Sequence, residues 1–387
     1  MDLYLKHQRI RYQRGNRAQK KKILDEFCEV HHYHRKSATR LLNQLAIPDK
    51  ARRKPGKAKA YKPEILLEPL KQLWLSSDQM CGKRLKQAIP IWIVHYEKHF
   101  DELPQGVYEQ LLTISAATID RLLKPLKVRY GRGLSGTKPG SLLKTQIPVK
   151  TNQWDITKVG FMEADTVAHC GTTLAGDFVW SLTLTDIASG WTENRATWNK
   201  GATGVLEQIK HIENNLPFPI LGFDSDNGSE FLNYHLLRYF TERPDQKSVQ
   251  FTRSRPYKKN DNAHVEQKNW THVRQLFGYY RFDNPKIVIL MNDLYSQELS
   301  SLLNFFYPCI KLIDKVRIKS SIKKKYDIAQ TPYQRLMAST CLNEEQKKAL
   351  TDKFNALDPF LLQKNVQKKL KLIFKHVNIQ DKQRTAI

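Results

Sequence analysis

The spacing of apolar positions changes near residue 151. Before that point, apolar residues recur every three or four positions in two stretches, 20–45 and 64–129, which is the spacing of amphipathic helices. After it, short apolar runs separated by glycine-containing turns predict strands. The chain therefore begins with a helical part and continues with a part that mixes strands and helices.

The second part alternates strands and helices in a definite order. The pattern predicts three strands, a helix, a strand, a helix, a short strand and a last helix, at 159–169, 178–189, 191–198, 201–216, 218–226, 229–240, 248–252 and 262–280. A meander followed by alternating units is typical of a mixed sheet covered by helices on its faces. We therefore predict an α/β core.

The stretch 20–45 predicts two short helices with a break around the histidines at 31–34. Such a pair is typical of a helix-turn-helix, whose second helix would present Arg35, Lys36 and Arg40 to a DNA groove. A small helical hairpin without a DNA role is the alternative. Cys28 and the nearby histidines resemble half of a zinc site, but the CxxC that would complete it is missing, which favours a turn of half-exposed histidines.

A second helical region spans 64–129, with Ser115 placed to cap a helix that contains Ile119. The stretch 51–63 before it is basic and interrupted by proline, as in a linker. The stretch 124–150 holds seven basic residues and no acidic ones, among glycines and prolines. We expect it to be an extended basic connection that lies along DNA.

Charge strengthens the nucleic-acid interpretation. The net charge is +26, and residues 1–150 carry 31 Lys and Arg against 13 Asp and Glu. Residues 151–285 carry 14 against 16, and residues 286–387 carry 19 against 9. A merely solvated surface would mix both signs throughout, whereas basic regions around a near-neutral centre indicate arms that bind nucleic acid around a module that collects carboxylates.

Other protein classes are disfavoured by missing signals. The chain has no signal-peptide pattern at its start and no apolar run of about 18 residues, so we expect a cytoplasmic, nucleoid-associated protein. Its five cysteines are scattered without a CxxC pair, which predicts reduced thiols. It has no GxxxxGK[ST] loop for ATP.

Three acids occupy matching positions in the second part. We expect Asp165 to close the first strand, Asp226 to close the fourth, and Glu266 to lie in the first turns of the last helix. Functional groups gather at strand ends and neighbouring helix starts, so these acids can converge. Converged carboxylates need a cation, and oxygen ligands favour Mg²⁺ or Mn²⁺; two such ions suit phosphodiester chemistry. A plain strand-to-helix turn is the alternative for residues 226–228 alone.

The motifs EADT (163–166), SDNGSEF (225–231) and DNAHVEQ (261–267) resemble the Asp-Asp-Glu signature of insertion-sequence transposases and retroviral integrases. The resemblance covers about 150–285 and, more weakly, LLNFFYP (302–308) and TP (331–332). It implies a ribonuclease-H-like core, with Asp165, Asp226 and Glu266 as catalytic metal ligands. It also implies cutting of double-stranded transposon ends, transfer of their 3′-hydroxyls to target DNA, and a homo-oligomeric assembly.

Several departures and neighbours of the motifs leave alternatives open. Asp224 stands where many relatives have histidine, which leaves open which aspartate binds metal, although Asp226 has the family's spacing to the glycine. Asp155 is a weaker candidate than Asp165, because no strand-like run precedes it. Trp270 is expected in the core. Basic residues near the last helix are expected to hold DNA phosphates: Arg253, Arg255, Lys258, Lys259 and Lys268.

The predicted organisation has four parts: a helix-turn-helix DNA-binding domain at 1–60, a second helical DNA-binding region and basic linker at 61–150, a ribonuclease-H-like integrase catalytic domain at 151–285, and a basic C-terminal region at 286–387. We expect a metal-dependent polynucleotidyl transferase of the transposase or integrase type. A catalytically silent DNA-binding derivative and a nuclease that stops at hydrolysis are the alternatives.

Overall fold

The computed structural model describes residues 2–43, 61–130, 158–225, 228, 230–231, 233–243, 248–253, 263–318 and 321–377. The chain forms two compact units, Met1–Ala60 and Tyr61–Ile387. The buried apolar side chains of each unit form their own cluster, so each unit has a separate core. None of the described helices is both long and apolar enough to cross a membrane.

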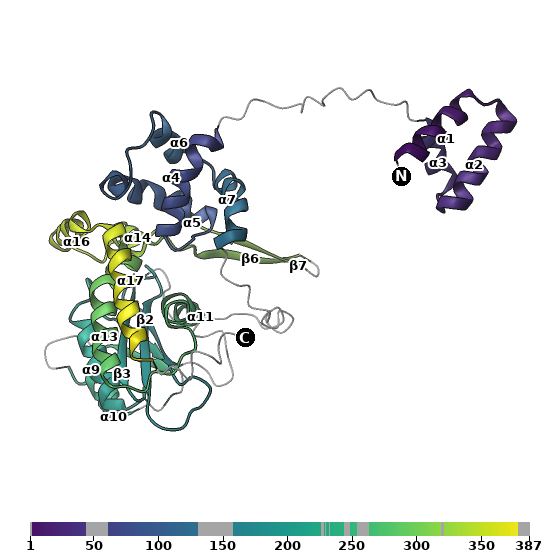
Figure 1. The fold of residues 1–387 in the computed structure, drawn as a ribbon. Helices are drawn as coiled ribbons and strands as arrows, with labels where there is room; N and C mark the ends of the chain where they lie inside the picture. The colour runs from purple at the N-terminus through teal and green to yellow at the C-terminus, as the bar shows by residue number, and fades with distance from the viewer. Residues whose placement is uncertain are drawn as a thin grey trace. The chain divides into compact units, whose positions relative to one another are not determined.

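The first unit contains three helices, α1 (Asp2–Arg14), α2 (Arg17–His31) and α3 (Arg35–Asn43) (Figure 1). Phe27 of α2 and Leu42 of α3 are among the buried side chains that hold them together. The break between α2 and α3 falls where the sequence predicted it, with His32 in the left-handed region at φ 54°. Whether α3 enters a DNA groove stays a prediction.

The second unit begins with a helical section: α4 (Pro63–Ser76), α5 (Gly82–Trp92), the 3₁₀ helix η1 (Ile93–Lys98), α6 (Val107–Thr113) and α7 (Ala116–Tyr130). The predicted cap at Ser115 is confirmed, because its Oγ accepts the N–H of Thr118 at 3.2 Å. Helices α5 and α7 approach so closely that a Cβ on Gly82 would lie 2.4 Å from the carbonyl oxygen of Ala116. Only glycine fits there.

A five-stranded mixed sheet follows, which the strand pattern predicted. Its strands are β1 (Phe161–Ala168), β2 (Val179–Asp186), β3 (Thr192–Trp198), β4 (Gly222–Ser225) and β5 (Gln250–Arg253), in the order β3-β2-β1-β4-β5. The pairs β1–β2 and β2–β3 are antiparallel, whereas β1–β4 and β4–β5 are parallel. The parallel pairs bring β4 and β5 into the sheet beside β1.

The expectation that Asp165 closes the first strand is wrong. Strand β1 continues three residues further, because its antiparallel pairing with β2 extends to Ala168, which lies opposite Trp180. The described parallel ladder with β4, however, ends where Ala164 lies opposite Ser225. Asp165 is thus the first residue of β1 beyond that ladder, at the carboxyl end of the parallel pair.

Helices cover both faces of the sheet. Helix α9 (Ala202–Glu213) lies on the face of Arg195, whose Nε donates to Nδ1 of His211 at 3.1 Å. The opposite face meets α11 (Ala263–Lys268), the π-helical segment η2 (Asn269–Arg274) and α12 (Gln275–Phe277). Helix α10 (Tyr234–Thr241) packs beside α9 and β5. The mixed sheet is therefore sandwiched between helices.

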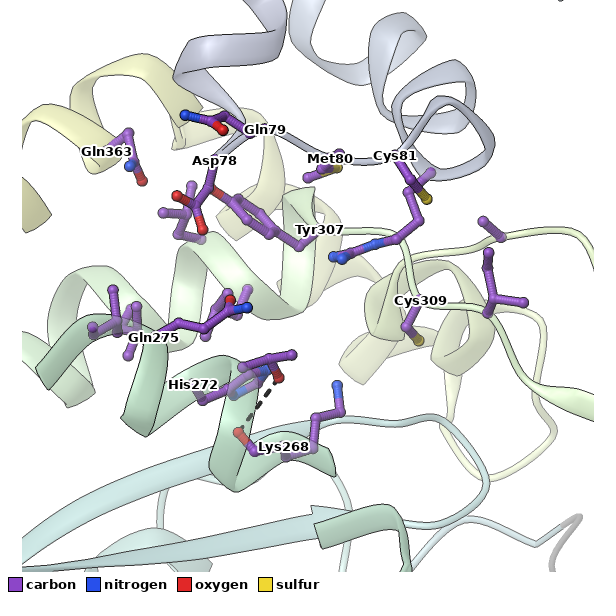
Figure 2. Close-up of a pocket in the computed structure, with 18 of the residues that line it drawn as sticks. Asp78, Gln79, Met80, Cys81, Lys268, His272, Gln275, Tyr307, Cys309 and Gln363 are labelled. Carbon is purple, nitrogen blue, oxygen red and sulfur yellow. Dashed lines mark hydrogen bonds between the residues drawn. The ribbon is translucent and has the colours of Figure 1, made fainter. Parts of the chain in front are cut away.

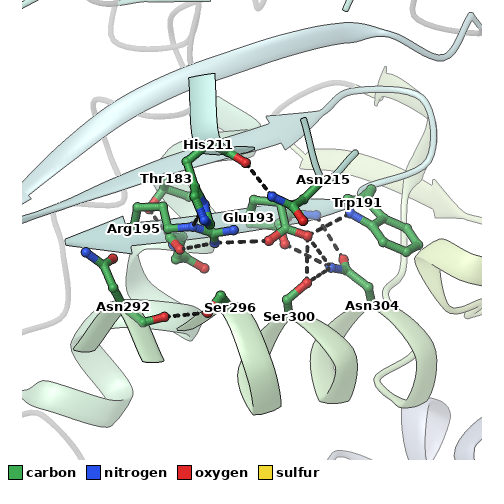
Figure 3. Close-up of polar contacts among 12 residues, drawn as sticks. Thr183, Trp191, Glu193, Arg195, His211, Asn215, Asn292, Ser296, Ser300 and Asn304 are labelled. Atoms are coloured by element: carbon green, nitrogen blue, oxygen red, sulfur yellow. Dashed lines mark hydrogen bonds and ion pairs between the residues drawn. The ribbon is translucent and has the colours of Figure 1, made fainter. Parts of the chain in front are cut away.

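The free edge of β3 is covered by α13 (Lys286–Asp293), the π-helical η3 (Leu294–Leu299) and α14 (Ser300–Phe306). Asn292 donates to the carbonyl of Ala196 and accepts its N–H at 2.9 and 2.7 Å. Asn304 does the same for Thr192, with both distances 2.9 Å (Figure 3). These side chains satisfy backbone groups that an edge strand otherwise leaves unpaired.

The last described elements are a two-stranded hairpin, β6 (Leu312–Ile318) and β7 (Ser321–Tyr326), and the helices α15 (Pro332–Met337), α16 (Glu344–Ala356) and α17 (Pro359–Lys375). The helical section is tied to this part of the unit. Trp92 Nε1 donates to the carbonyl of Phe306 at 3.1 Å, and His99 Nε2 meets Asp358 Oδ2 at 2.8 Å.

Candidate active site

Carboxylates gather on one face of the sheet at the β1–β4 pair. Side chains alternate along a strand, so Glu163 and Asp165 of β1 point to the same face. Asp224 of β4 lies directly opposite Glu163 in the parallel register and therefore shares that face. Its Oδ1 accepts a hydrogen bond from Thr252 Oγ1 of β5 at 2.6 Å. The strand pairing alone thus brings three acids together.

The helix that carries Glu266 is anchored over these acids at two points. Glu163 Oε2 accepts the backbone N–H groups of His264 and Val265, each at 3.0 Å, at the start of α11. One turn later, Asn269 Nδ2 donates to Asp165 Oδ2 at 2.7 Å. Glu266 lies between these anchors, in the first turn of α11 as predicted. Asp165 and Glu266 are therefore held at the same side of the sheet.

Burial and, to a smaller extent, the neighbouring carboxylates disfavour the charged form of Glu163. Burial raises the pKa of Glu163 to about 8, the N–H groups of Val265 and His264 oppose that rise, and the carboxylates of Asp224 and Glu266 add to it. Carboxylate oxygens are the ligands that Mg²⁺ and Mn²⁺ prefer. A carboxylate oxygen has two lone pairs, so the hydrogen bonds of Asp165 do not prevent it from holding a cation. The donor set fits a hard divalent ion.

The second predicted metal ligand, Asp226, lies outside the described residues. Its chain neighbour Ser225 is opposite Ala164, the residue that precedes Asp165. In the described part of the chain, no three or more His, Cys, Asp or Glu side chains form a group that could hold a metal ion. That finding does not test a set that includes Asp226. The metal ligation by Asp165, Asp226 and Glu266 stays a prediction.

Glu230 ties the segment after Asp226 back to the sheet. It is buried, and its Oε1 accepts from Thr166 Oγ1 of β1 at 3.0 Å and pairs with Lys200 Nζ at 2.9 Å. A Cβ on Gly228 would come within 2.3 Å of Glu230 Oε2. The glycine of this motif therefore leaves room for a buried carboxylate.

The residues predicted to bind DNA lie in several places. Arg35, Lys36 and Arg40 are exposed on α3, where Arg35 forms an ion pair with Asp25. Arg253 is exposed at the end of β5, and Lys268 is half-buried on α11. Arg255, Lys258 and Lys259 lie outside the described residues. Their contacts with DNA stay predictions.

The expectation that Trp270 belongs to the core is wrong. Its side chain is 49% exposed, whereas the neighbouring Asn269 and His272 are buried. Trp270 follows Glu266 by four positions and shares its exposed side of the helix, whereas Val265, Asn269 and Val273 form the buried side. His169, which follows β1, is fully buried and stacks on Phe282, so it serves as a packing residue.

Sequence reasoning missed Glu163, Asn269 and Glu230 as parts of the site. Glu163 could have been found, because a residue two positions before Asp165 on a strand shares its face. Asn269 follows Glu266 by three positions and so lies near it on a helix. Glu230 gave no such signal, since its partner Thr166 comes from a distant strand.

These elements define an α/β protein with a five-stranded mixed sheet and an acidic site covered by one helix. No family model matches the sequence. The uncharacterized protein y4rM of Sinorhizobium fredii (strain NBRC 101917 / NGR234) is 38% identical over 320 residues, which cover 82% of this chain and 89% of that protein. The chain belongs to the family of y4rM.

Two solved structures resemble part of the chain. The catalytic core domain of BIV integrase is 17% identical, with a TM-score of 0.24 over 31% of this chain and 70% of that one. The simian T-cell lymphotropic virus intasome in complex with PP2A regulatory subunit B56 gamma is 14% identical, with a TM-score of 0.29 over 48% of this chain and 60% of that one. At these TM-scores the likenesses carry no weight, and the fold assignment rests on strand order and register.

Proposed function

We propose that the chain is a transposase or integrase that cuts the ends of a DNA element and joins their 3′-hydroxyls to target DNA. The observation that carries the proposal is the double anchoring of the helix with Glu266, through Glu163 at its start and Asn269 to Asp165 one turn later. The strand order, three antiparallel strands followed by two parallel ones, supports a ribonuclease-H-like core for this chemistry.

Each residue of the site has a distinct task in this proposal. Asp165, Asp226 and Glu266 would hold two divalent ions, which when bound would activate a water or a 3′-hydroxyl and stabilise the leaving oxygen. Asn269 fixes the Asp165 carboxylate by donating to its Oδ2. Glu163 positions α11 by accepting two backbone N–H groups. Glu230, with Thr166 and Lys200, holds the segment that follows Asp226 against β1.

The basic regions supply the grip on DNA in this proposal. Helix α3 of the first unit, with Arg35, Lys36 and Arg40, would recognise the ends of the element. Arg253, Arg255, Lys258, Lys259 and Lys268 would hold phosphates beside the acids. Assembly of several copies on paired ends is expected from the resemblance stated above.

A substitution of Asp226 tests the chemistry directly. Asp226→Asn removes one ligand charge without changing the basic surfaces, so it should bind element-end DNA like the wild type and lose Mg²⁺-dependent nicking and joining. Asp352→Asn is the control, since it makes the same change in charge at an exposed acid on α16 that is not part of the site. We expect it to retain cutting. Gel assays of nicked and joined DNA measure both.

Three outcomes of this assay contradict the proposal. If Asp226→Asn joined DNA at the wild-type rate, Asp226 would not be a required metal ligand. A wild-type chain that binds element-end DNA but never nicks it in Mg²⁺ or Mn²⁺ would instead be a silent DNA-binding derivative. Nicking without any joined product would indicate a nuclease that stops at hydrolysis.

A further inference from the structure

A large cleft opens within the second unit, on the side of α11 and η2 away from the acids. Its volume is about 1350 Å³, and its walls come from the turn before α5, the α11–α12 stretch, the segment after α14, the hairpin strand β7 and α17. Figure 2 shows Lys268 extending into this space from the catalytic helix, across from the turn that contains Met80 and Cys81. We call it the basic cleft, because of its charge.

Basic side chains reach the basic cleft from four elements. Helix α5 contributes Lys83, Arg84 and Lys86, and α11 contributes Lys268. The remaining cations are Lys324 of β7 and Lys371 and Lys375 of α17. Among the described residues, two acids line the cleft, Asp78 and Asp327, and Asp327 pairs with Arg335 at 2.6 Å. The cleft therefore carries a strong excess of positive charge.

Acids neutralise some lysines of the second unit. Lys127, Lys200 and Lys369 each pair with a carboxylate within 3 Å. In the part of the chain that the structure describes, none of the six cleft lysines has an acidic partner within ion-pair distance. Like charges held close together repel one another. A bound polyanion would neutralise them.

The shape and the apolar lining decide which polyanion fits. The cleft exceeds the roughly 300–1000 Å³ of ordinary small-molecule pockets. Its lining also includes Tyr326, which is 48% exposed next to the lysines of β7, and Ile328, which is 70% exposed. Lysines beside an exposed aromatic ring are the arrangement that binds an unpaired strand, with phosphates on the cations and bases stacked on the ring.

We propose that the basic cleft binds an unpaired DNA strand beside the catalytic helix. The proposal rests on the function proposed above and adds a second surface to it, because α11 and η2 turn Asn269 toward Asp165 and line the cleft with Lys268, Thr271 and His272. A strand separated from its complement at the cut end would have a place next to the acids without occupying them.

Helix α17 offers a matched pair of variants for the test. Lys371 and Lys375 line the cleft, whereas Lys364 and Lys368 are equally exposed on the same helix and do not. The full-length double variants Lys371→Gln/Lys375→Gln and Lys364→Gln/Lys368→Gln make the same change in charge. Fluorescence anisotropy with a labelled unpaired oligonucleotide and with its duplex, without divalent ions and over a series of salt concentrations, measures their binding.

The cleft pair should weaken binding of the unpaired strand and reduce its salt dependence. Each lost phosphate contact lowers the slope of log K against log salt by about 0.7 for a single strand, so two lower it by about 1.4. At about 0.1 M salt this corresponds to a roughly 25-fold loss of affinity. The control pair should bind like the wild type. Tyr326→Ala should lose roughly tenfold with an unchanged salt slope, because it removes stacking alone.

Equal losses in both α17 pairs, or no loss in either, would overturn the proposal, because binding would then not depend on the cleft. Loss of duplex binding with unchanged binding of the unpaired strand would also overturn it, in favour of a duplex groove. The proposal for the cleft and the proposal for the acids can be refuted independently. A wild type that never nicks DNA, but whose cleft variants bind as expected, contradicts only the proposed enzyme function; normal nicking with unaffected cleft variants contradicts only this inference.

Discussion

Glu163 is a buried carboxyl group, and backbone N–H groups at the start of α11 offset the desolvation penalty of its burial. Its side chain is 2% exposed, and one of its oxygens accepts two of the N–H groups that α11 leaves unpaired in its first turn, those of His264 and Val265. The arrangement links two parts of the site, since the strand with Asp165 and the helix with Glu266 are joined through it. The alternation of side chains along β1 could have predicted which face of the sheet Glu163 occupies. Nothing in the sequence indicated which backbone N–H groups it would bind.

Substitutions of Glu163 should show how far the site depends on its acceptor oxygen. Glu163→Leu leaves two backbone donors without their partner at about 1–3 kcal/mol each, so we expect a loss of roughly 2–6 kcal/mol in unfolding free energy and of most Mg²⁺-dependent joining. Glu163→Gln keeps an oxygen acceptor and should lose less of both. Urea denaturation and joining assays measure these effects. A Leu variant as stable as the wild type would show that the helix does not depend on this contact.

His169 should make the stability of the second unit depend on acid pH. Burial, together with the nearby charge of Arg274, lowers the pKa of His169 to about 3. Between pH 3 and about 6.5 the unfolded chain binds a proton at this residue and the folded chain does not. The contribution is therefore complete above about pH 6.5, and it falls by roughly 1.4 kcal/mol per pH unit as the pH drops toward 3.

His169→Gln should flatten that dependence, which unfolding experiments at a series of pH values would measure. The exposed His235 is the control, and His235→Gln should keep the wild-type slope. A His169→Gln profile parallel to that of the wild type would mean that another group causes the acid sensitivity.

Among the elements, those with a clean periodicity were predictable and those with irregular geometry were not. The order of strands and helices from 161 to 268 followed from periods of about two and 3.6 residues. Nothing in the sequence predicted the π-helical turns of η2 and η3. The error at Trp270 arose because it lies on the exposed side of its helix together with Glu266. The apolar run 159–169 contained the whole of β1, but the expectation that Asp165 closes the strand placed its end three residues before Ala168.

The cover on β3 depends on side chains that no local pattern reveals. Asn304 lies on α14, more than a hundred positions from Thr192, yet it pairs with both backbone groups of that residue. Glu193 lies beside it and accepts from Ser300 Oγ at 2.6 Å and Trp191 Nε1 at 3.0 Å (Figure 3). The edge of the sheet is thus closed by a network of long-range contacts.

Asn304→Ala should open this edge. It leaves the N–H and the carbonyl of Thr192 buried without partners, so we expect the unfolding free energy to fall by roughly 2–4 kcal/mol. Asn355 on α16 is exposed and provides the control, since Asn355→Ala should change stability by only a few tenths of a kcal/mol. Thermal or urea unfolding of both variants tests this. Similar small effects in the two would indicate that water replaces Asn304 at the edge.

At the scale of the whole chain, the described cores fall into two independent clusters. Tyr12, Leu24, Phe27 and Leu42 belong to the first unit alone, while the second cluster begins at Leu66 and continues through the sheet to Val377. The charge pattern indicated basic regions on both sides of the centre. It gave no sign that Trp92 of the helical section and Phe360 of α17 pack together, with ring centroids 5.0 Å apart.

Because the cores are separate, the chain 61–387 should fold without the first unit. We expect its main thermal transition to match that of the full chain, with Mg²⁺-dependent cutting retained and selective binding of element ends lost. Phe27→Ala in the full chain should leave the main transition unchanged, whereas Phe277→Ala should lower the stability of the second unit by about 3–5 kcal/mol. Calorimetry of the four proteins measures this. If the shortened chain melted well below the full chain, the first unit would stabilise the second. If the shortened chain still bound element ends selectively, residues outside α3 would recognise those ends.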